Sequence, residues 1–145
     1  MKERIWIVAA NSSIARIFQA ENNHEMIELE ALTHPKSRMK ASELGTDKPG
    51  RAFDSFGGGR HSVSDAEDIK DHEAVVFAKE VAVALTKAVN DGKTSKIYLA
   101  ASPAFLGILR QHFHPPLEKV IAEEINKDLC MLSTKEIRNH LPTYL

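Results

Sequence analysis

The stretch that decides the fold is residues 5–32, IWIVAANSSIARIFQAENNHEMIELEAL. Its β-branched and aromatic runs at residues 5–8 and 14–18 flank a turn-forming Asn-Ser-Ser, a pattern that predicts a β-hairpin. After a second polar turn at residues 21–24, residues 26–32 alternate apolar and charged side chains, as a strand with one solvated face does. We therefore expect the chain to begin with a three-stranded antiparallel meander.

A long helix is the next element that the sequence predicts. Ser64 and Glu67 have the spacing of a capping box, and the turn at residues 90–92, Asn-Asp-Gly, ends the apolar periodicity. One apolar stripe follows Ala74 along this helix. A second stripe, at Val76 and Val83, predicts that the helix packs on two sides.

Strand and helix signals then alternate to the end of the chain. Residues 97–101 are an apolar run suited to a central strand, and the next helix begins at Ser102-Pro103. A short helical turn and a strand within residues 120–129 follow, and Ser133 caps a last helix. The order is β-β-β-α-β-α-β-α, which predicts an α/β fold of ribonuclease-H-like architecture, a mixed sheet with helices packed on its faces. At 145 residues the whole chain, 1–145, is expected to be a single domain.

Composition narrows the class of protein. Nineteen Lys and Arg residues against 20 Asp and Glu give no global attraction to nucleic acid or to lipid. The single cysteine, Cys130, allows no intrachain disulfide and favours a reducing compartment. The apolar run at residues 5–10 is too short for a signal-peptide core, and no later segment is long and apolar enough for a membrane span. We expect a cytoplasmic protein without a membrane partner.

Residues 34–65 lack periodicity and contain the stretch DKPGRAFDSFGGGRHSVS at residues 47–64. A connection of this length is usually functional or disordered, and we predict a long basic Gly-rich loop here. Three consecutive glycines leave the backbone free to present N–H groups to a phosphate, while arginines and lysines add charge and aromatic rings can stack on bases. The predicted RNA- or phosphate-binding residues are Arg38, Lys48, Arg51, Phe53, Phe56, Gly57, Gly58, Gly59, Arg60 and His61.

Other chemistries find little support. A two-metal nuclease needs carboxylates that converge on the sheet, yet the first strand has none and ends at the neutral Asn11, with Asp54 and Asp128 far away in the sequence. The seven histidines fit no compact zinc motif, and no Gly-x-Ser-x-Gly elbow is present. We therefore predict no catalytic residues, no metal and no cofactor.

An ordered set of short motifs adds a family resemblance. The motifs are WIVAA at residues 6–10, ARIF at 15–18, PGRAFDS at 49–55, GGGRH at 57–61, FLG at 105–107 and KDL at 127–129. Together they resemble the bacterial family of proteins required for attachment to host cells, over nearly the whole chain. That family is similar to the central domain of archaeal and eukaryotic peptide-chain release factors, which implies a ribonuclease-H-like fold. Gly58 and Gly59 match the paired glycines of the release-factor Gly-Gly-Gln loop, but Arg60 stands in place of the glutamine.

The resemblance and the basic loop together give the expected function. We expect a non-enzymatic module that presents the loop to RNA, with the ribosome or tRNA as partner. One alternative is direct protein–protein contact in host-cell attachment. Another is hydrolysis of the peptidyl-tRNA ester in the manner of release factors, with His61 as the base, although a cation at position 60 suits phosphate better than the placing of a water. The open edge that a meander leaves also allows a homodimer.

Overall fold

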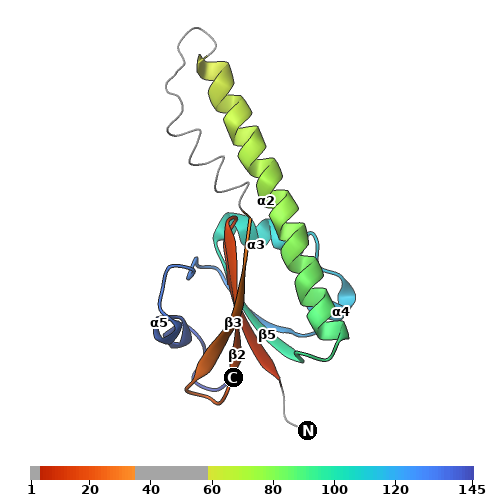
Figure 1. The fold of residues 1–145 in the computed structure, drawn as a ribbon, viewed down its shortest axis with the longest axis vertical. Coiled ribbons are helices and arrows are strands. Elements are labelled where there is room, and N and C mark those ends of the chain that lie inside the picture. The colour runs from red at the N-terminus through yellow and green to blue at the C-terminus, as the bar shows by residue number, and fades with distance from the viewer. Residues whose placement is uncertain (1–3, 35–58) are drawn as a thin grey trace.

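The computed structural model describes residues 4–34 and 59–145, and from 59 to 71 it describes the backbone alone. Three strands come first: β1 (Ile5–Ala10), β2 (Ile14–Ala20) and β3 (Met26–Thr33). Helices and strands then alternate through α2 (Gly59–Asn90), β5 (Lys96–Ala101), α3 (Pro103–Arg110), α4 (Pro115–Glu118), β6 (Ile121–Ile125) and α5 (Thr134–Asn139). Figure 1 shows the strands at the centre, with α2 and α5 on opposite sides of them.

The strands form one mixed sheet in the order β3-β2-β1-β5-β6. β1, β2 and β3 pair antiparallel, as the meander predicts, and β5 and β6 continue from β1 as parallel strands. The parallel pairs require crossovers, which α2 and the α3–α4 pair supply. The predicted α/β fold with a mixed sheet is confirmed, and the predicted short turn before the last strand is α4.

Two apolar cores lie on the two faces of the sheet. α2, α3 and α4 cover one face, where Val8, Ile17 and Leu99 meet Phe77 and Leu109. The C-terminal segment and α5 cover the other, where Ile7, Phe18 and Tyr98 meet Leu129 and Ile137. Because both faces are covered, the central strands β1 and β5 are almost wholly apolar and buried.

Helix α2 begins earlier than the capping signal predicts. It begins at Gly59, not at Ser64, so Gly59, Arg60 and His61 lie in its first turn and not in a loop. Propagation of a helix adds one hydrogen bond for each residue that is fixed, so a helix anchored on a core extends past a local cap signal. A glycine at the very start costs little, because the first N–H groups have no partner within the helix.

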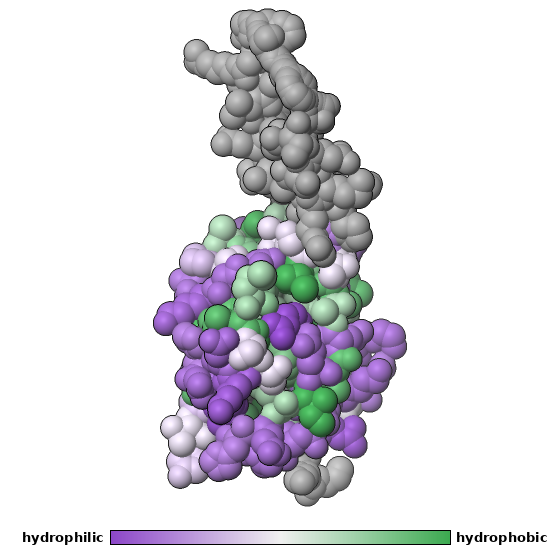
Figure 2. Space-filling view, turned by 60° about the vertical axis from the view of Figure 1, so that its left-hand side comes forward, coloured by the Kyte–Doolittle hydropathy of each residue, from purple (hydrophilic) through white to green (hydrophobic). Residues whose placement is uncertain are grey.

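Only one side of α2 is buried. The buried residues follow the predicted main stripe, through Phe77, Val81 and Leu85, whereas Val83 is 67% exposed. The prediction of packing on two sides is therefore wrong for the part of α2 whose side chains are described. Figure 2 shows a body surface that is mainly hydrophilic, with small separate hydrophobic areas.

The N-terminal half of α2 extends beyond the sheet. The helix has 32 residues, which corresponds to a length of about 48 Å. Its first buried side chains among those described are Glu73 and Ala74. In Figure 1 the yellow-green half of α2 stands clear of the strands and of the other labelled helices, so the start of the helix lies far from the cores.

Candidate functional site

The predicted phosphate-binding residues fall into two groups. Seven lie outside the described residues: Arg38, Lys48, Arg51, Phe53, Phe56, Gly57 and Gly58. Gly59, Arg60 and His61 form the first three residues of α2, where the backbone is described and the side chains are not. That these ten residues bind phosphate stays a prediction.

The start of α2 has the backbone features of an anion-binding end. The first four N–H groups of a helix have no partner within the helix, and the helix dipole places partial positive charge there. No acidic residue lies in the first turn of α2. The C-terminal end of the basic stretch thus coincides with the positive end of a long helix.

A buried polar pair joins β3 to α2 at the base of this projecting helix. His34 directly follows β3, and its Nε2 lies 2.6 Å from Oε1 of Glu73 on α2. Nδ1 of His34 lies 3.5 Å from Oε1 of Glu80, which is about two turns further along the same face of α2. His34 and Glu73 are only 6% and 8% exposed. Histidine and glutamate are rarely so buried unless they are paired.

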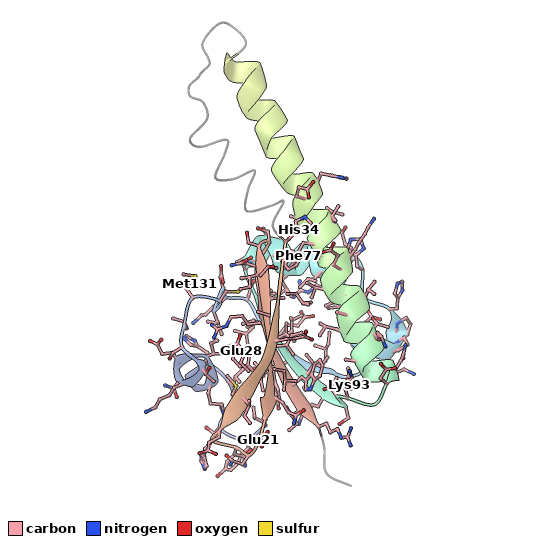
Figure 3. All side chains as sticks on the ribbon, viewed as in Figure 1. Glu21, Glu28, His34, Phe77, Lys93 and Met131 are labelled. Carbon is pink, nitrogen blue, oxygen red and sulfur yellow. The ribbon has the colours of Figure 1, made fainter. Side chains whose placement is uncertain are left out.

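Aromatic rings continue from this pair into the core. The ring of His34 lies 5.5 Å from that of Phe77, which stacks at 5.9 Å on Phe105 of α3. Figure 3 shows His34 and Phe77 together where β3 ends beside α2. The backbone N–H of His34 also donates to the carbonyl of Ser13 in the β1–β2 turn. The base of α2 is therefore fixed to two strands and to a second helix.

The carboxyl ends of the parallel strands, where α/β proteins often bind ligands, are occupied by structural hydrogen bonds. Asn11 Nδ2 donates to Asp128 Oδ2 at 3.1 Å, and Asn11 Oδ1 accepts from the N–H groups of Ser13 and Ile14. Asp128 Oδ1 accepts from the N–H of Cys130. Within residues 4–34 and 72–145 no three His, Cys, Asp or Glu side chains are grouped so that they could hold a metal ion. Asn11 and Asp128 thus close turns.

Cys130 also lies at this end of the sheet, and its Sγ lies 3.8 Å from the carbonyl of Ile14. Burial, followed by the hydrogen bond with Asp128, raises the pKa of its thiol to about 12. A thiol of that pKa is not ionised at neutral pH, so it is a poor nucleophile and a poor metal ligand. Cys130 belongs to the core, as its apolar neighbours in the sequence predict.

Two clefts among the described residues lie away from the start of α2. The larger, about 1090 Å³, is lined by residues at the start of β1 and the end of β2, together with Gly92, Ser95 and Leu145. The smaller, about 400 Å³, lies beside β6 and is lined by Arg110, Phe113 and three glutamates. Neither contains a predicted site residue. No helix in the described ranges is both long and apolar enough to cross a membrane.

Comparison with known families now identifies the chain. Residues 6–141 match the model of the family described as "Protein required for attachment to host cells". The chain belongs to that family. The match spans nearly all of both cores, so the short motifs that suggested this host-attachment family reflect a resemblance over the whole fold. Comparison with curated proteins gave no significant match.

Solved structures share the fold at low sequence identity. The crystal structure of an archaeal translation termination factor, aRF1, is similar with a TM-score of 0.54 and 14% identity, over 97% of this chain and 35% of the factor. The Ppx/GppA phosphatase of Aquifex aeolicus, type II variant, has a TM-score of 0.42 and 12% identity, over 86% of this chain and 36% of the phosphatase. The host-attachment chain spans about a third of either protein. The likeness to aRF1 confirms the predicted release-factor-like, ribonuclease-H-like fold.

The pair at the base of α2 was not predicted from the sequence. A weak signal existed: Glu73 lies four positions before Phe77, on the apolar stripe of α2, where a carboxylate needs a partner. Nothing local connects it to His34, which is 39 residues away. His72, by contrast, is exposed, as expected for a residue on the solvated face.

Proposed function

We propose that this member of the host-attachment family is a non-enzymatic RNA-binding module that presents the basic Gly-rich stretch, at the start of α2, to the phosphates of ribosomal RNA or tRNA. The observation that carries the proposal is the geometry of α2. Residues 59–72 precede the first described buried side chains of the helix and span about 21 Å. The helix thus places Gly59, Arg60 and His61 beyond the sheet (Figure 1).

The distribution of charge supports a polyanionic partner. Residues 36–60 contain six Lys and Arg against three Asp and Glu, a charge of +3, whereas the whole chain carries −1, which leaves −4 on the rest. Attraction to phosphate is therefore concentrated in the stretch that ends at the helix start. Arginine and lysine contacts to phosphate release counterions, so the binding is expected to weaken steeply with salt.

The ribosome is favoured over other RNA partners by one comparison. The structure that shares the fold over 97% of this chain belongs to a translation termination factor. Arg60 takes the place of the glutamine of the release-factor loop, and a guanidinium donates hydrogen bonds but accepts none. We therefore assign to this chain the binding of RNA and not the hydrolysis of peptidyl-tRNA.

Sedimentation with purified ribosomes, and filter binding with tRNA, test the proposal. The variant Arg51→Ala/Arg60→Ala is compared with Lys79→Ala/Lys93→Ala, which removes the same charge from exposed positions on the C-terminal half of α2 and the turn that follows it. The first variant is expected to bind more weakly and to reduce the slope of log K against log salt by about 2, one for each phosphate contact. Equal binding by the two variants would contradict the proposal.

Two alternatives make different predictions. Direct contact with a host cell, which the description of the family allows, requires the protein outside the bacterium, so an exclusively cytosolic pool on fractionation would exclude it. Ester hydrolysis with His61 as the base predicts that the unaltered protein releases peptide from peptidyl-tRNA and that His61→Ala loses this activity. Release that is absent from the unaltered protein, or that survives the substitution, would exclude that role.

A further inference from the structure

His34 and Glu73 bring together the two ends of the stretch that the proposed function uses. His34 is the last described residue before the basic stretch, and Glu73 is the first described side chain that α2 buries after it. The 2.6 Å contact between Nε2 and Oε1 closes a loop of 39 residues. The pair therefore ties the end of β3 to the first described buried residue of α2.

The imidazole ring faces a carboxylate at each nitrogen. Nε2 faces Glu73, and Nδ1 faces Glu80, whose side chain is 54% exposed. Among the described residues these two glutamates, both on α2, are the ionisable groups within ion-pair distance of the ring. The other neighbours are the Phe77 ring and, through the His34 backbone N–H, the carbonyl of Ser13. β3, the β1–β2 turn and α3 thus contribute no charge at this distance.

The protonation state of the ring decides whether it can donate a hydrogen bond to both glutamates or to only one. The imidazolium carries an N–H on both nitrogens, whereas neutral imidazole carries only one. The backbone hydrogen bond from His34 to the carbonyl of Ser13 does not depend on the proton. Loss of the proton therefore keeps His34 in place but removes one donor, and the attraction of its charge, from the contact with α2.

We propose that His34 is a proton-operated latch at the base of α2. In the protonated state the ring holds both glutamates and fixes the helix against the end of β3. In the neutral state the ring donates to one carboxylate at most, and the first buried turns of α2 open more often. The sign follows: the latch is closed while the ring carries its proton, and it loosens when rising pH removes that proton.

The consequence for RNA binding rests on the proposed function, but the latch itself does not. A fixed base restricts the positions that the start of α2 can reach, so the closed latch reduces the ordering that binding requires. The latch is therefore tested on the free protein, without RNA. Its failure would leave the RNA-binding proposal intact, and failure of RNA binding would leave the latch intact.

Amide hydrogen exchange of the full chain measures how often the first buried turns of α2 open. The rates are expressed as protection factors, so that the pH dependence of intrinsic exchange cancels. Between about pH 5.5 and pH 8 the protection of amides at residues 73–80 is expected to fall by about tenfold or more, the worth of one charge-assisted hydrogen bond. Amides at residues 134–139 in α5 serve as the reference within the same molecule. His72→Gln removes an exposed histidine from the same helix and is expected to retain the full pH dependence.

The variant that decides the matter is His34→Gln. Its amide can still donate to Glu73 but does not titrate, so protection at residues 73–80 is expected to become independent of pH relative to α5. Should this variant fail to fold, the ¹⁵N spectrum of the His34 ring in the unaltered protein decides instead, and two protonated nitrogens are expected at the low-pH end of the native range. Any one of three results would overturn the latch. Protection could be independent of pH in the unaltered protein, the pH dependence could be unchanged in His34→Gln, or the ring could carry only one proton at low pH.

Discussion

Replacement of Arg16 by lysine tests whether one guanidinium holds the C-terminal segment on the sheet. Nε and Nη2 of Arg16 donate to the two carboxylate oxygens of Glu28 on β3, at 3.1 and 3.0 Å. Nη1 donates to the backbone carbonyls of Cys130 and Leu132, at 2.8 and 2.6 Å. The side chain is 15% exposed. Its pKa is raised, chiefly by the hydrogen bond with Glu28, so the charge is permanent.

The expected loss follows from what a lysine can replace. An ammonium on a flexible stem keeps an ion pair with Glu28, but it lacks the planar fork that reaches two carbonyls at the same time. Two charge-assisted hydrogen bonds to backbone carbonyls are then lost or weakened, and their partners are partly buried. We expect Arg16→Lys to lower the free energy of unfolding by about 2 to 4 kcal/mol, a large part of the stability of a typical domain.

Urea unfolding followed by circular dichroism measures this change, and an unchanged m-value shows that the unfolded state is the same. Arg110→Lys is the matched control, because Arg110 pairs with Glu124 through its side chain on an exposed surface and no carbonyl contact accompanies the pair. That variant is expected to unfold like the unaltered protein. If Arg16→Lys lost no more stability than Arg110→Lys, the attribution of stability to the two carbonyl contacts would be refuted.

Four further predictions concern single positions. Ser133→Ala removes the cap of α5, whose capping box is formed, and should cost about 1 kcal/mol in urea unfolding. The hydrogen bond from the Ser133 backbone N–H lowers the pKa of Glu136 below its ordinary 4.5. The stability that ionised Glu136 contributes is therefore present above pH 4.5 and should be lost as pH falls through the lowered pKa. Glu136→Gln should abolish this part of the pH dependence. Because the Cys130 thiol has a pKa of about 12, iodoacetamide at neutral pH should modify it in urea but not in the native protein. Gly92 has φ of +75°, and apart from its chain neighbours no described residue has an atom within 4 Å of an added Cβ. Gly92→Ala should therefore destabilise by about 1 to 2 kcal/mol through backbone strain alone, whereas Gly107→Ala within α3 should not.

The parts of the fold that the sequence predicted are those decided by local patterns. Alternation and turn residues located β1, β2 and β3, and the capping box of α5 forms between Ser133 and Glu136 as their spacing predicts. The same kind of signal at Ser64 failed for α2. There the start of the helix is decided by propagation from a segment anchored on the core, which no local pattern encodes.

The sequence predicted which residues could bind phosphate, but not the contacts that hold the base of α2 on the body. The basic Gly-rich stretch is visible in the sequence because charge and glycine content are local properties. The pair of His34 and Glu73 depends on the register of β3 against α2, across 39 residues, and could be found only in three dimensions. Asn11 and Asp128 show the reverse case. The sequence argued against a metal site there, and the structure explains why these polar residues are present: they hydrogen-bond to each other and to the neighbouring backbone.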